Sequence, residues 1–423
     1  MKQFLSTIVR KVLPPGQLRG VENTYRRARA WLLGMWYGHP AKSLKVIAIT
    51  GTNGKTTTAY FLNEMLKAGH YKTALFSTAV IELAGKKHLN DLNVTVASTG
   101  RMQQFFKQAK HAGVDFVILE ATSHSLDQHK LAGVPIEVAV MTNLTQDHLD
   151  YHKTMQGYAA AKGKLFAKKP RIMVLNKDDA WFSYFNKYPA PQKLSYGKDA
   201  SATVQMQNVH DTTVDVRLPT GDVVSVQSAL PGEFNLYNLA AAASVASALG
   251  VAPSAIKKGA AAVTGIPGRF ETVATNTPYK VVVDYAHTPD ALEKLLTTAQ
   301  HITKNNTLLV FGACGDRDKA KRPIMGEIAA KSANQIFLTD EESYSEDPDQ
   351  IRAQILQGIQ KAGGAAKTTE VPDRRQAIKQ ALETAKKGDT ILITGMGHEQ
   401  FRIIQGKKVP WNDVAVVQEI LRG

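Results

Sequence analysis

Residues 46–60, VIAITGTNGKTTTAY, contain the residue types of a phosphate-binding turn. An apolar, β-branched run predicts a buried strand, and the alanine- and leucine-bearing run after the turn predicts a helix. Gly51 and Gly54 leave the backbone free to curl, so that its N–H groups point into one concavity at a helix N-terminus. We expect Lys55 to reach the β- and γ-phosphates of a nucleotide, and the hydroxyl of Thr56 to sit on Mg²⁺.

The match to the general P-loop pattern is partial. That pattern has a glycine where Ile49 stands here, so the chain fits a shorter variant in which Gly51 makes the turn. The alternative is an ordinary strand–turn–helix with a solvated lysine. The Gly-Lys-Thr-Thr run behind a buried strand favours a nucleotide site.

Further polar residues follow the next predicted strands. The strand at 116–119 runs into Glu120, and an acid at the carboxyl end of a parallel strand is well placed to hold Mg²⁺. His148 lies just past the strand at 138–143 and could share that metal region, although a lone histidine is more often structural or solvent-facing. Lys162 stands among alanines, which is typical of an exposed helix face.

Similar clusters occur later in the chain. Asn235 and Asn238 lie just ahead of an alanine-rich stretch, where they would cap a helix or face a nucleotide. Asp284 and His287 follow one predicted strand, and Arg317 lies in a glycine turn after another. A last strand runs into the segment GMGHE at 395–399, which holds Gly395 and Glu399.

The alternation of short apolar runs with helical stretches predicts an α/β fold in two domains. These are a P-loop parallel-sheet central domain over 41–265 and a Rossmann-like C-terminal α/β domain over 266–423, with a candidate hinge at 265–269. Polar–apolar alternation over 200–226 predicts a small antiparallel patch. The other predicted elements are strands at 72–76, 171–176, 280–283, 307–311, 336–339 and 390–394, and helices to about residue 67, at 101–112, from 158, up to 249 and from 289.

The net charge and the cysteine count limit the classes of partner and the cellular compartment that we expect. The 423 residues carry a formal net charge of +15, which suits nucleic acid, an anionic membrane surface, or substrates that bear phosphate and carboxylate groups. No nucleic-acid-binding motif is visible, so we expect no nucleic-acid partner. A single cysteine, Cys314, excludes an intramolecular disulfide and fits a reducing cytoplasm. No apolar run is long enough to predict a membrane-spanning helix.

Residues 1–40 form a short basic and aromatic segment without the pattern of a signal peptide. Within it, residues 25–37 combine arginines with tryptophan, leucine and methionine. Such a segment suits peripheral contact with a membrane interface, where arginines meet anionic headgroups. The alternative is a helix that packs its apolar face on the protein body or on a partner.

In chain order, these segments resemble the Mur ligases, ATP-dependent amino-acid ligases of peptidoglycan precursor synthesis, and are most similar to the MurE type (UDP-N-acetylmuramoyl-tripeptide ligase). The resemblance spans residues 37–423. Its motifs are YGHPAKSLKVIAITGTNGKTTT, EATSHSL, TNLTQDHLDYH, YAAAKGKLF, PGRFE, VDYAHTPDALEKLL, GDRDKAKRPIMG and GMGHE. It implies an ATP-dependent ligase that adds an amino acid to a muramyl peptide through an acyl phosphate, giving ADP and phosphate. It also implies a role in cell wall biogenesis, cell shape and cell division.

The resemblance assigns roles to particular residues. It implies catalytic roles for Lys55, Glu120, His148 and Lys162, with Lys162 carbamylated into a metal-bridging carboxylate. Mg²⁺ would be held by Thr56, Glu120, His148 and the modified Lys162. ATP would contact Gly51, Thr52, Asn53, Gly54, Lys55, Thr56, Thr57, Asn235, Asn238, Arg269, Asp284 and His287. The substrates would contact Thr95, Thr122, Ser123, His124, Gln128, Lys130, Arg317, Glu341, Gly395 and Glu399.

The chain departs from MurE-type enzymes in three places. Only about forty residues precede the phosphate loop region, too few for the domain that holds the uridine diphosphate in that type. The amino-acid selector reads Glu341-Glu342-Ser343-Tyr344 instead of Asp-Asn-Pro-Arg, which disfavours diaminopimelate and favours lysine or another cationic amino acid. Thr95-Val96-Ala97 replaces the usual Thr-Thr-Pro at the substrate contact.

Three functions therefore stay open. The first is a cytoplasmic ligase that acts on a muramyl peptide. The second keeps this chemistry on a lipid-linked or other carboxylate acceptor, with the enzyme at the inner face of the membrane. The third is a nucleotide-binding scaffold without activity, which the presence of all four catalytic candidates disfavours.

Overall fold

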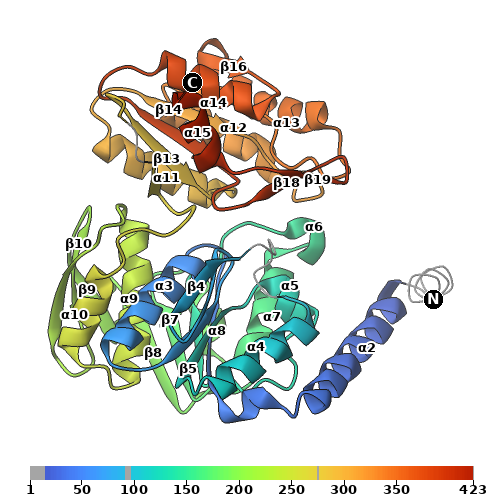
Figure 1. The fold of residues 1–423 in the computed structure, drawn as a ribbon, viewed down its shortest axis with the longest axis vertical. Coiled ribbons are helices and arrows are strands. Elements are labelled where there is room, and N and C mark those ends of the chain that lie inside the picture. Colours follow the sequence, from blue (N-terminus) through green and yellow to red (C-terminus); the bar gives the residue numbers. More distant parts are fainter. Residues whose placement is uncertain (1–14, 91–96, 274–275, 423) are drawn as a thin grey trace.

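The computed structural model describes residues 15–90, 97–273 and 276–422. Two α/β regions lie one above the other in Figure 1, each built on its own sheet. A long helix, α2 (Pro15–Trp36), lies at the edge of the lower region beside α4. A short 3₁₀ turn, η1 (Pro40–Ser43), joins α2 to the first strand.

The lower region contains an eleven-stranded sheet in the order β11-β10-β9-β8-β7-β6-β1-β5-β2-β3-β4. Neighbouring strands pair in parallel across the middle of the sheet, in the spatial order β9-β8-β7-β6-β1-β5-β2. The pairs at both edges, β11-β10-β9 and β2-β3-β4, are antiparallel. Its strands are β1 (Lys45–Thr50), β2 (Thr73–Phe76), β3 (Val80–Leu83), β4 (Lys86–Leu89), β5 (Phe116–Glu120), β6 (Val138–Met141), β7 (Ile172–Asn176), β8 (Gln192–Gly197), β9 (Val204–His210), β10 (Thr213–Arg217) and β11 (Val223–Gln227).

Helices cover both faces of this sheet. One face packs on α3 (Lys55–Ala68), α9 (Glu233–Ala248) and α10 (Pro253–Ala261). The other packs on α4 (Thr99–His111), α5 (Ser123–Asp127), α7 (Met155–Phe166) and α8 (Phe182–Asn186), and α6 (Leu149–His152) follows β6. Strand β1 is buried on both sides, with Ile47 and Ile49 facing the first core and Val46 and Ala48 the second. A strand apolar on both faces is what a covered parallel sheet requires.

The upper region has a six-stranded sheet in the order β12-β13-β17-β14-β15-β16, parallel except for β12. Its strands are β12 (Glu271–Thr272), β13 (Lys280–Asp284), β14 (Thr307–Phe311), β15 (Gln335–Leu338), β16 (Thr368–Glu370) and β17 (Thr390–Thr394). Helices α11 (Pro289–Ile302), α12 (Lys321–Ser332) and α13 (Pro348–Lys361) cover one face, and α14 (Arg374–Thr384) and α15 (Asp413–Arg422) the other. A turn, η2 (Ala365–Lys367), and a hairpin of β18 (Phe401–Ile404) and β19 (Lys407–Pro410) complete it.

The predicted α/β class and the parallel strand–helix alternation are confirmed, and so is the antiparallel patch, which is β9 to β11. The capping interpretation of the two asparagines is wrong, because Asn235 and Asn238 lie inside α9 and its N-cap is Gly232. The domain division at residue 265 stays a prediction. No helix within the described ranges is long and apolar enough to cross a membrane.

Candidate functional site

A cleft of about 1490 Å³ lies between the two regions. The carboxyl ends of β1, β5 and β6 meet it from below, and those of β13 and β17 meet it from above, since Thr56, Glu120, Asn143, Asp284 and Gly395 all line it. Parallel α/β sheets bind their ligands at this edge. The cleft is larger than the 300–1,000 Å³ of a usual small-molecule pocket, so it has room for more than one substrate.

The turn at the centre of the cleft needs glycine at two positions. Gly54 caps α3 with φ 85°, and a Cβ there would lie 2.1 Å from Oδ1 of Asn238. A Cβ on Gly51 would lie 1.8 Å from Oγ1 of Thr142. The turn is therefore packed too closely for any side chain, and the N-terminus of α3 opens onto the cleft with its N–H groups available to an anion.

Two lysines meet at the carbonyl of Gly51. Lys55 donates from Nζ to the carbonyls of Gly51 at 3.0 Å and Thr52 at 2.7 Å, and Lys162 donates to Gly51 at 2.7 Å. Lys162 is 1% exposed, so the interpretation of an exposed helix face is wrong. Burial lowers the pKa of both amines, and for Lys162 the charge of Lys55 lowers it further. The pKa of Lys162 lies well below its usual value, so this amine is partly neutral and can act as a nucleophile toward CO₂.

Glu120 is a buried acid at the phosphate-loop end of the cleft. Its carboxylate accepts hydrogen bonds from the Thr56 hydroxyl at 2.9 Å, the Thr78 N–H at 2.7 Å and the Thr78 hydroxyl at 2.9 Å. The side chain is therefore fixed in place at the carboxyl end of β5. A threonine hydroxyl beside a carboxylate, at the start of a phosphate-loop helix, is a donor set that suits Mg²⁺.

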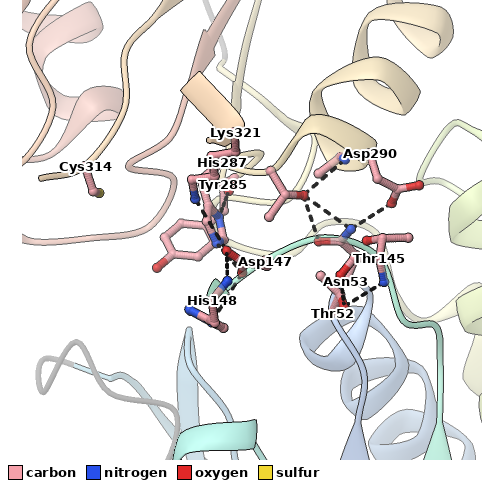
Figure 2. A network of polar contacts seen from close by, with 12 residues as sticks. Thr52, Asn53, Thr145, Asp147, His148, Tyr285, His287, Asp290, Cys314 and Lys321 are labelled. Carbon is pink, nitrogen blue, oxygen red and sulfur yellow. Dashed lines mark hydrogen bonds and ion pairs between the residues drawn. The ribbon is translucent and has the colours of Figure 1, made fainter. Parts of the chain in front are cut away.

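His148 belongs to a second charged group, built around Asp147 (Figure 2). The Asp147 carboxylate lies 3.2 Å from Nε2 of His148, 3.5 Å from Nζ of Lys321 and 3.9 Å from Nε2 of His287. Burial opposes ionisation, but Lys321 and then the two histidines hold the pKa of Asp147 well below its usual range. Burial lowers the pKa of His148 well below its usual value, which leaves a neutral imidazole able to bind a metal.

The residues present fit a Mg²⁺ site in part. Glu120 and Thr56 would supply two oxygen ligands, and His148, in the loop after β6, lines the same cleft. Among the described residues, no three His, Cys, Asp or Glu side chains gather closely enough to hold a metal by themselves. A second anionic ligand would be needed, and a carbamylated Lys162 would supply one.

The upper region docks directly onto the phosphate loop (Figure 2). Asn53 donates to Asp290 at 2.8 Å, and Nε2 of His398 lies 3.0 Å from the Thr78 carbonyl. Arg269 donates to the Thr56 hydroxyl at 3.1 Å. The same hydroxyl that contacts Glu120 thus contacts an arginine of the 265–269 joint, so both regions meet at one atom of the loop.

The other residues predicted to bind nucleotide lie on the same walls. Asn238 accepts from the Thr58 hydroxyl at 3.4 Å and contacts Asn235, whose amide donates to the Pro231 carbonyl at 2.8 Å. Asp284 accepts two backbone N–H bonds at 2.7 Å, and burial raises its pKa. These contacts hold the walls of the cleft rigid around the loop.

The far end of the cleft holds buried carboxylates. Glu399 accepts from the Tyr285 hydroxyl at 3.1 Å, and burial, followed by the charge of Glu342, raises its pKa to about 9. Glu342 accepts from the hydroxyl of Tyr344 at 2.8 Å, and the Arg317 guanidinium stacks on the Tyr344 ring at 4.8 Å. Glu399 therefore keeps its proton at neutral pH, so the negative charge of this end comes from Glu342, with Arg317 beside it.

Most predicted site residues line the cleft, although their roles stay predictions. Those lining it are Thr52, Asn53, Gly54, Lys55, Thr56, Thr57, Glu120, Thr122, His124, Gln128, Lys130, His148, Asn235, Asn238, Arg269, Asp284, His287, Arg317, Gly395 and Glu399. Gly51, Lys162, Ser123 and Glu341 lie behind its wall: Ser123 is buried in α5, and Glu341 accepts from Cys314 Sγ at 3.2 Å. Thr95 lies outside the described residues.

Sequence reasoning missed Thr78, Asp147 and Lys321. Asp147 adjoins His148 in TNLTQDHLDYH, and Lys321 stands in GDRDKAKRPIMG, so both motifs contained the signal. Thr78 lies between β2 and β3 in a stretch with no motif, and only the fold brings it to Glu120.

Two domain families match the chain. Residues 49–246 match the Mur ligase middle domain, and residues 268–397 match the Mur ligase glutamate ligase domain. Two curated relatives are UDP-N-acetylmuramoyl-L-alanyl-D-glutamate–2,6-diaminopimelate ligases. The one from Geobacillus kaustophilus is 39% identical over 94% of this chain and 83% of its own length. The one from Bacillus cereus is 38% identical over 95% and 83%.

Solved structures agree. A structure of a UDP-N-acetylmuramoyl-L-alanyl-D-glutamate–2,6-diaminopimelate ligase superposes with a TM-score of 0.61 at 35% identity, covering 90% of this chain and 78% of that one. Folylpolyglutamate synthase from Mycobacterium tuberculosis, complexed with ADP, gives a TM-score of 0.73 at 20% identity, over 87% and 91%. At that identity the second likeness concerns the fold.

Proposed function

The chain belongs to the Mur ligase family of ATP-dependent ligases, and we propose that it joins an amino acid to a carboxylate of a muramyl peptide, a precursor of peptidoglycan. The product is an amide, and ATP is converted to ADP and phosphate. The contact that supports this most is the Thr56 hydroxyl, which lies 2.9 Å from Glu120 and 3.1 Å from Arg269. Phosphoryl transfer needs such a point, where an acid, a cation and a phosphate loop converge.

The first step activates the acceptor. A carboxylate oxygen of the acceptor attacks the γ-phosphorus, the bond to the β–γ bridging oxygen breaks, and an acyl phosphate and ADP result. Lys55 would leave its two carbonyl partners to bind the transferring group, and the N-terminus of α3 adds N–H donors. Arg269 would add positive charge from above.

Mg²⁺ would be held by Thr56, Glu120, His148 and Lys162 as its carbamate, and when bound it would neutralise phosphate charge. The depressed pKa of Lys162 supports this, because carbamate forms from a neutral amine. Glu120 would then exchange part of its threonine hydrogen bonds for the ion.

The second step forms the amide. The amino group of the incoming amino acid attacks the acyl carbon, phosphate leaves with the acceptor's oxygen, and the nitrogen loses a proton. Contacts of Asn53 with Asp290, and of Thr78 with His398, hold the upper region against the loop. Such closure brings the amine to the acyl phosphate and excludes the water that would hydrolyse it.

We propose that the amino acid is lysine or another one with a cationic side chain. The amino-acid end of the cleft carries Glu342 and Glu399, and Arg317 is left to bind the α-carboxylate. Tyr344 stands where the selector of diaminopimelate-adding enzymes has an arginine, and its hydroxyl already donates to Glu342. A second carboxylate on the substrate would be repelled by the Glu342 carboxylate, whereas an ammonium group would be attracted to it and would favour ionisation of Glu399.

The acceptor is UDP-linked or lipid-linked. The exposed aromatic and basic segment at 25–37 favours the lipid-linked acceptor, because such a segment suits contact at the inner face of the membrane. Thr122, His124, Gln128 and Lys130 would bind the acceptor, since all four line the cleft.

The direct test is ATP-dependent phosphate release by the purified chain, measured with lysine or diaminopimelate and a muramyl dipeptide that is either UDP-linked or lipid-linked. We expect turnover that needs ATP, Mg²⁺, acceptor and lysine together, and a rate about 1,000-fold lower in Lys55→Ala. If the chain binds ATP but neither acceptor supports turnover, its carboxylate substrate is a different one. Absence of ATP binding and hydrolysis under every condition would favour the scaffold and contradict the proposal.

A further inference from the structure

Helix α2 (Pro15–Trp36) exposes large apolar side chains that nothing in the described chain covers. Trp36 is 85% exposed and Trp31 56%, and Val21, Tyr25, Leu32 and Met35 are also exposed. Most large apolar side chains elsewhere in the described chain are buried or partly buried. Monomeric proteins rarely leave such a contiguous apolar surface without a function.

These side chains form one stripe along the helix. Val21, Tyr25, Leu32 and Met35 are separated by four, seven and three residues, a spacing that puts them on one side of a helix. The opposite side faces the protein, where Ala30 and Gly34 are buried and the helix packs beside α4 (Figure 1). The other face of α2 therefore makes the contacts with the protein body, and the stripe remains available to an external partner.

The basic residues of this segment indicate what kind of partner the stripe binds. Residues 1–36 contain seven lysines and arginines and one acid, Glu22, which is paired with Arg26 at 3.0 Å. Arg27 and Arg29 are exposed and flank the stripe on its two sides, as 3.6-residue spacing places them. Two such helices from two copies would bring like charges together, whereas an anionic surface would be attracted.

We infer that the stripe of α2 docks in the plane of an anionic phospholipid bilayer, with its tryptophans at the headgroup boundary and Arg27 and Arg29 on lipid phosphates. A helix with an apolar side, aromatic residues and flanking cations is the type that lies in a membrane interface. The basic residues add electrostatic attraction that salt weakens. This docking is independent of the ligase reaction.

One consequence does rest on the proposed function. Burial lowers the pKa of His129, and the next cause is the charge of Arg27, so α2 lies near the segment that carries Gln128 and Lys130. Those two residues line the proposed acceptor end of the cleft. A bilayer held by α2 would then lie near that end, where a lipid-linked acceptor would arrive.

The test is flotation of the full chain with 100 nm vesicles, either pure phosphatidylcholine or an equal mixture with phosphatidylglycerol, at low and high salt. We expect binding to the anionic vesicles, a blue shift of tryptophan fluorescence, and at least about tenfold weaker binding in high salt. Failure of the unmodified chain to bind anionic vesicles would overturn the inference, whether or not the chain is an active ligase.

Two pairs of variants separate the contributions. Trp31→Glu with Leu32→Glu should abolish binding, and Val223→Glu, which puts a charge on an exposed apolar residue of β11, should not.

Arg27→Glu with Arg29→Glu should weaken vesicle binding at least about tenfold. Lys257→Glu with Lys258→Glu on α10 makes the same change in net charge and should leave most binding. Light scattering on each variant reports the oligomeric state. A dimer that the Trp31 and Leu32 changes dissociate, without vesicle binding, would assign the stripe to a second copy and contradict the membrane.

Discussion

The two ends of the cleft differ in how their residues are brought together: one is a single short segment, and the other is assembled from several loops. At the phosphate end, glycine geometry, a helix N-terminus and Lys55 make the site, and all of them lie within residues 51–56. At the amino-acid end, Glu342, Glu399 and Arg317 come from separate loops of the upper region and meet only after folding. The first end suits a group that every family member must bind, and the second can change one side chain at a time.

The largest expected effect is at the phosphate end. Lys55→Ala should lower the rate of ATP-dependent phosphate release by about 1,000-fold, since it removes the cation that we propose binds the transferring phosphoryl group. Initial rates at saturating ATP measure this. Lys257→Ala, on the exposed face of α10, is the control and should keep nearly full activity. A Lys55→Ala enzyme within tenfold of the unmodified chain would mean that the two ends do not differ as described.

A second large effect concerns the support of the amino-acid end. Arg374 and Asp413 form a fully buried ion pair at 2.7 Å, and Arg374 also donates to the Thr394 carbonyl, just before Gly395. Arg374→Met should cost about 3–5 kcal/mol of unfolding free energy, because it leaves Asp413 buried and unpaired. Urea unfolding measures it.

The neighbouring Arg375 gives the matched control. Its ion pair with Glu419 is largely exposed, so Arg375→Met should cost about 1 kcal/mol or less. Equal losses from the two arginines would show that the buried pair does not support this end.

A smaller effect tests the choice of amino acid. Tyr344→Arg should shift the ratio of kcat/KM for lysine over diaminopimelate by about 10- to 100-fold toward diaminopimelate, because it adds a cation for a second carboxylate. Tyr344→Phe keeps the ring under Arg317 and should leave the preference for lysine. An unmodified enzyme that already prefers diaminopimelate would refute the assignment.

A further effect is a pH dependence of stability. Folded Glu399 keeps its proton to about pH 9, whereas the unfolded chain loses it near the ordinary value of 4.5. Between these two values the unfolded state binds fewer protons, so the unfolding free energy should fall as pH rises. Glu399→Gln should flatten this decline, and Glu383→Gln on the exposed face of α14 should not. Parallel pH curves for the unmodified chain and Glu399→Gln would contradict the prediction.

The sequence was informative wherever local geometry made the site. The turn at 51–56 and the acid at the end of β5 could be located because one strand and one helix fix the turn and one strand fixes the acid. Lys162 was misread from its alanine neighbours, since its burial depends on α7 packing behind the loop. Thr78 and the Asp147–Lys321 pair also depend on tertiary contacts, the second joining residues far apart in the chain.

Isotope transfer tests the ligase chemistry most directly. With ¹⁸O in the acceptor carboxylate, the acyl phosphate route passes one carboxylate oxygen to the phosphate that the amine displaces. Mass spectrometry of the released phosphate should therefore find one ¹⁸O per amide formed, in a reaction that requires Lys55. Amide formation with unlabelled phosphate would mean that the acceptor oxygen never attacked the γ-phosphorus, and would contradict the reaction assigned to this cleft.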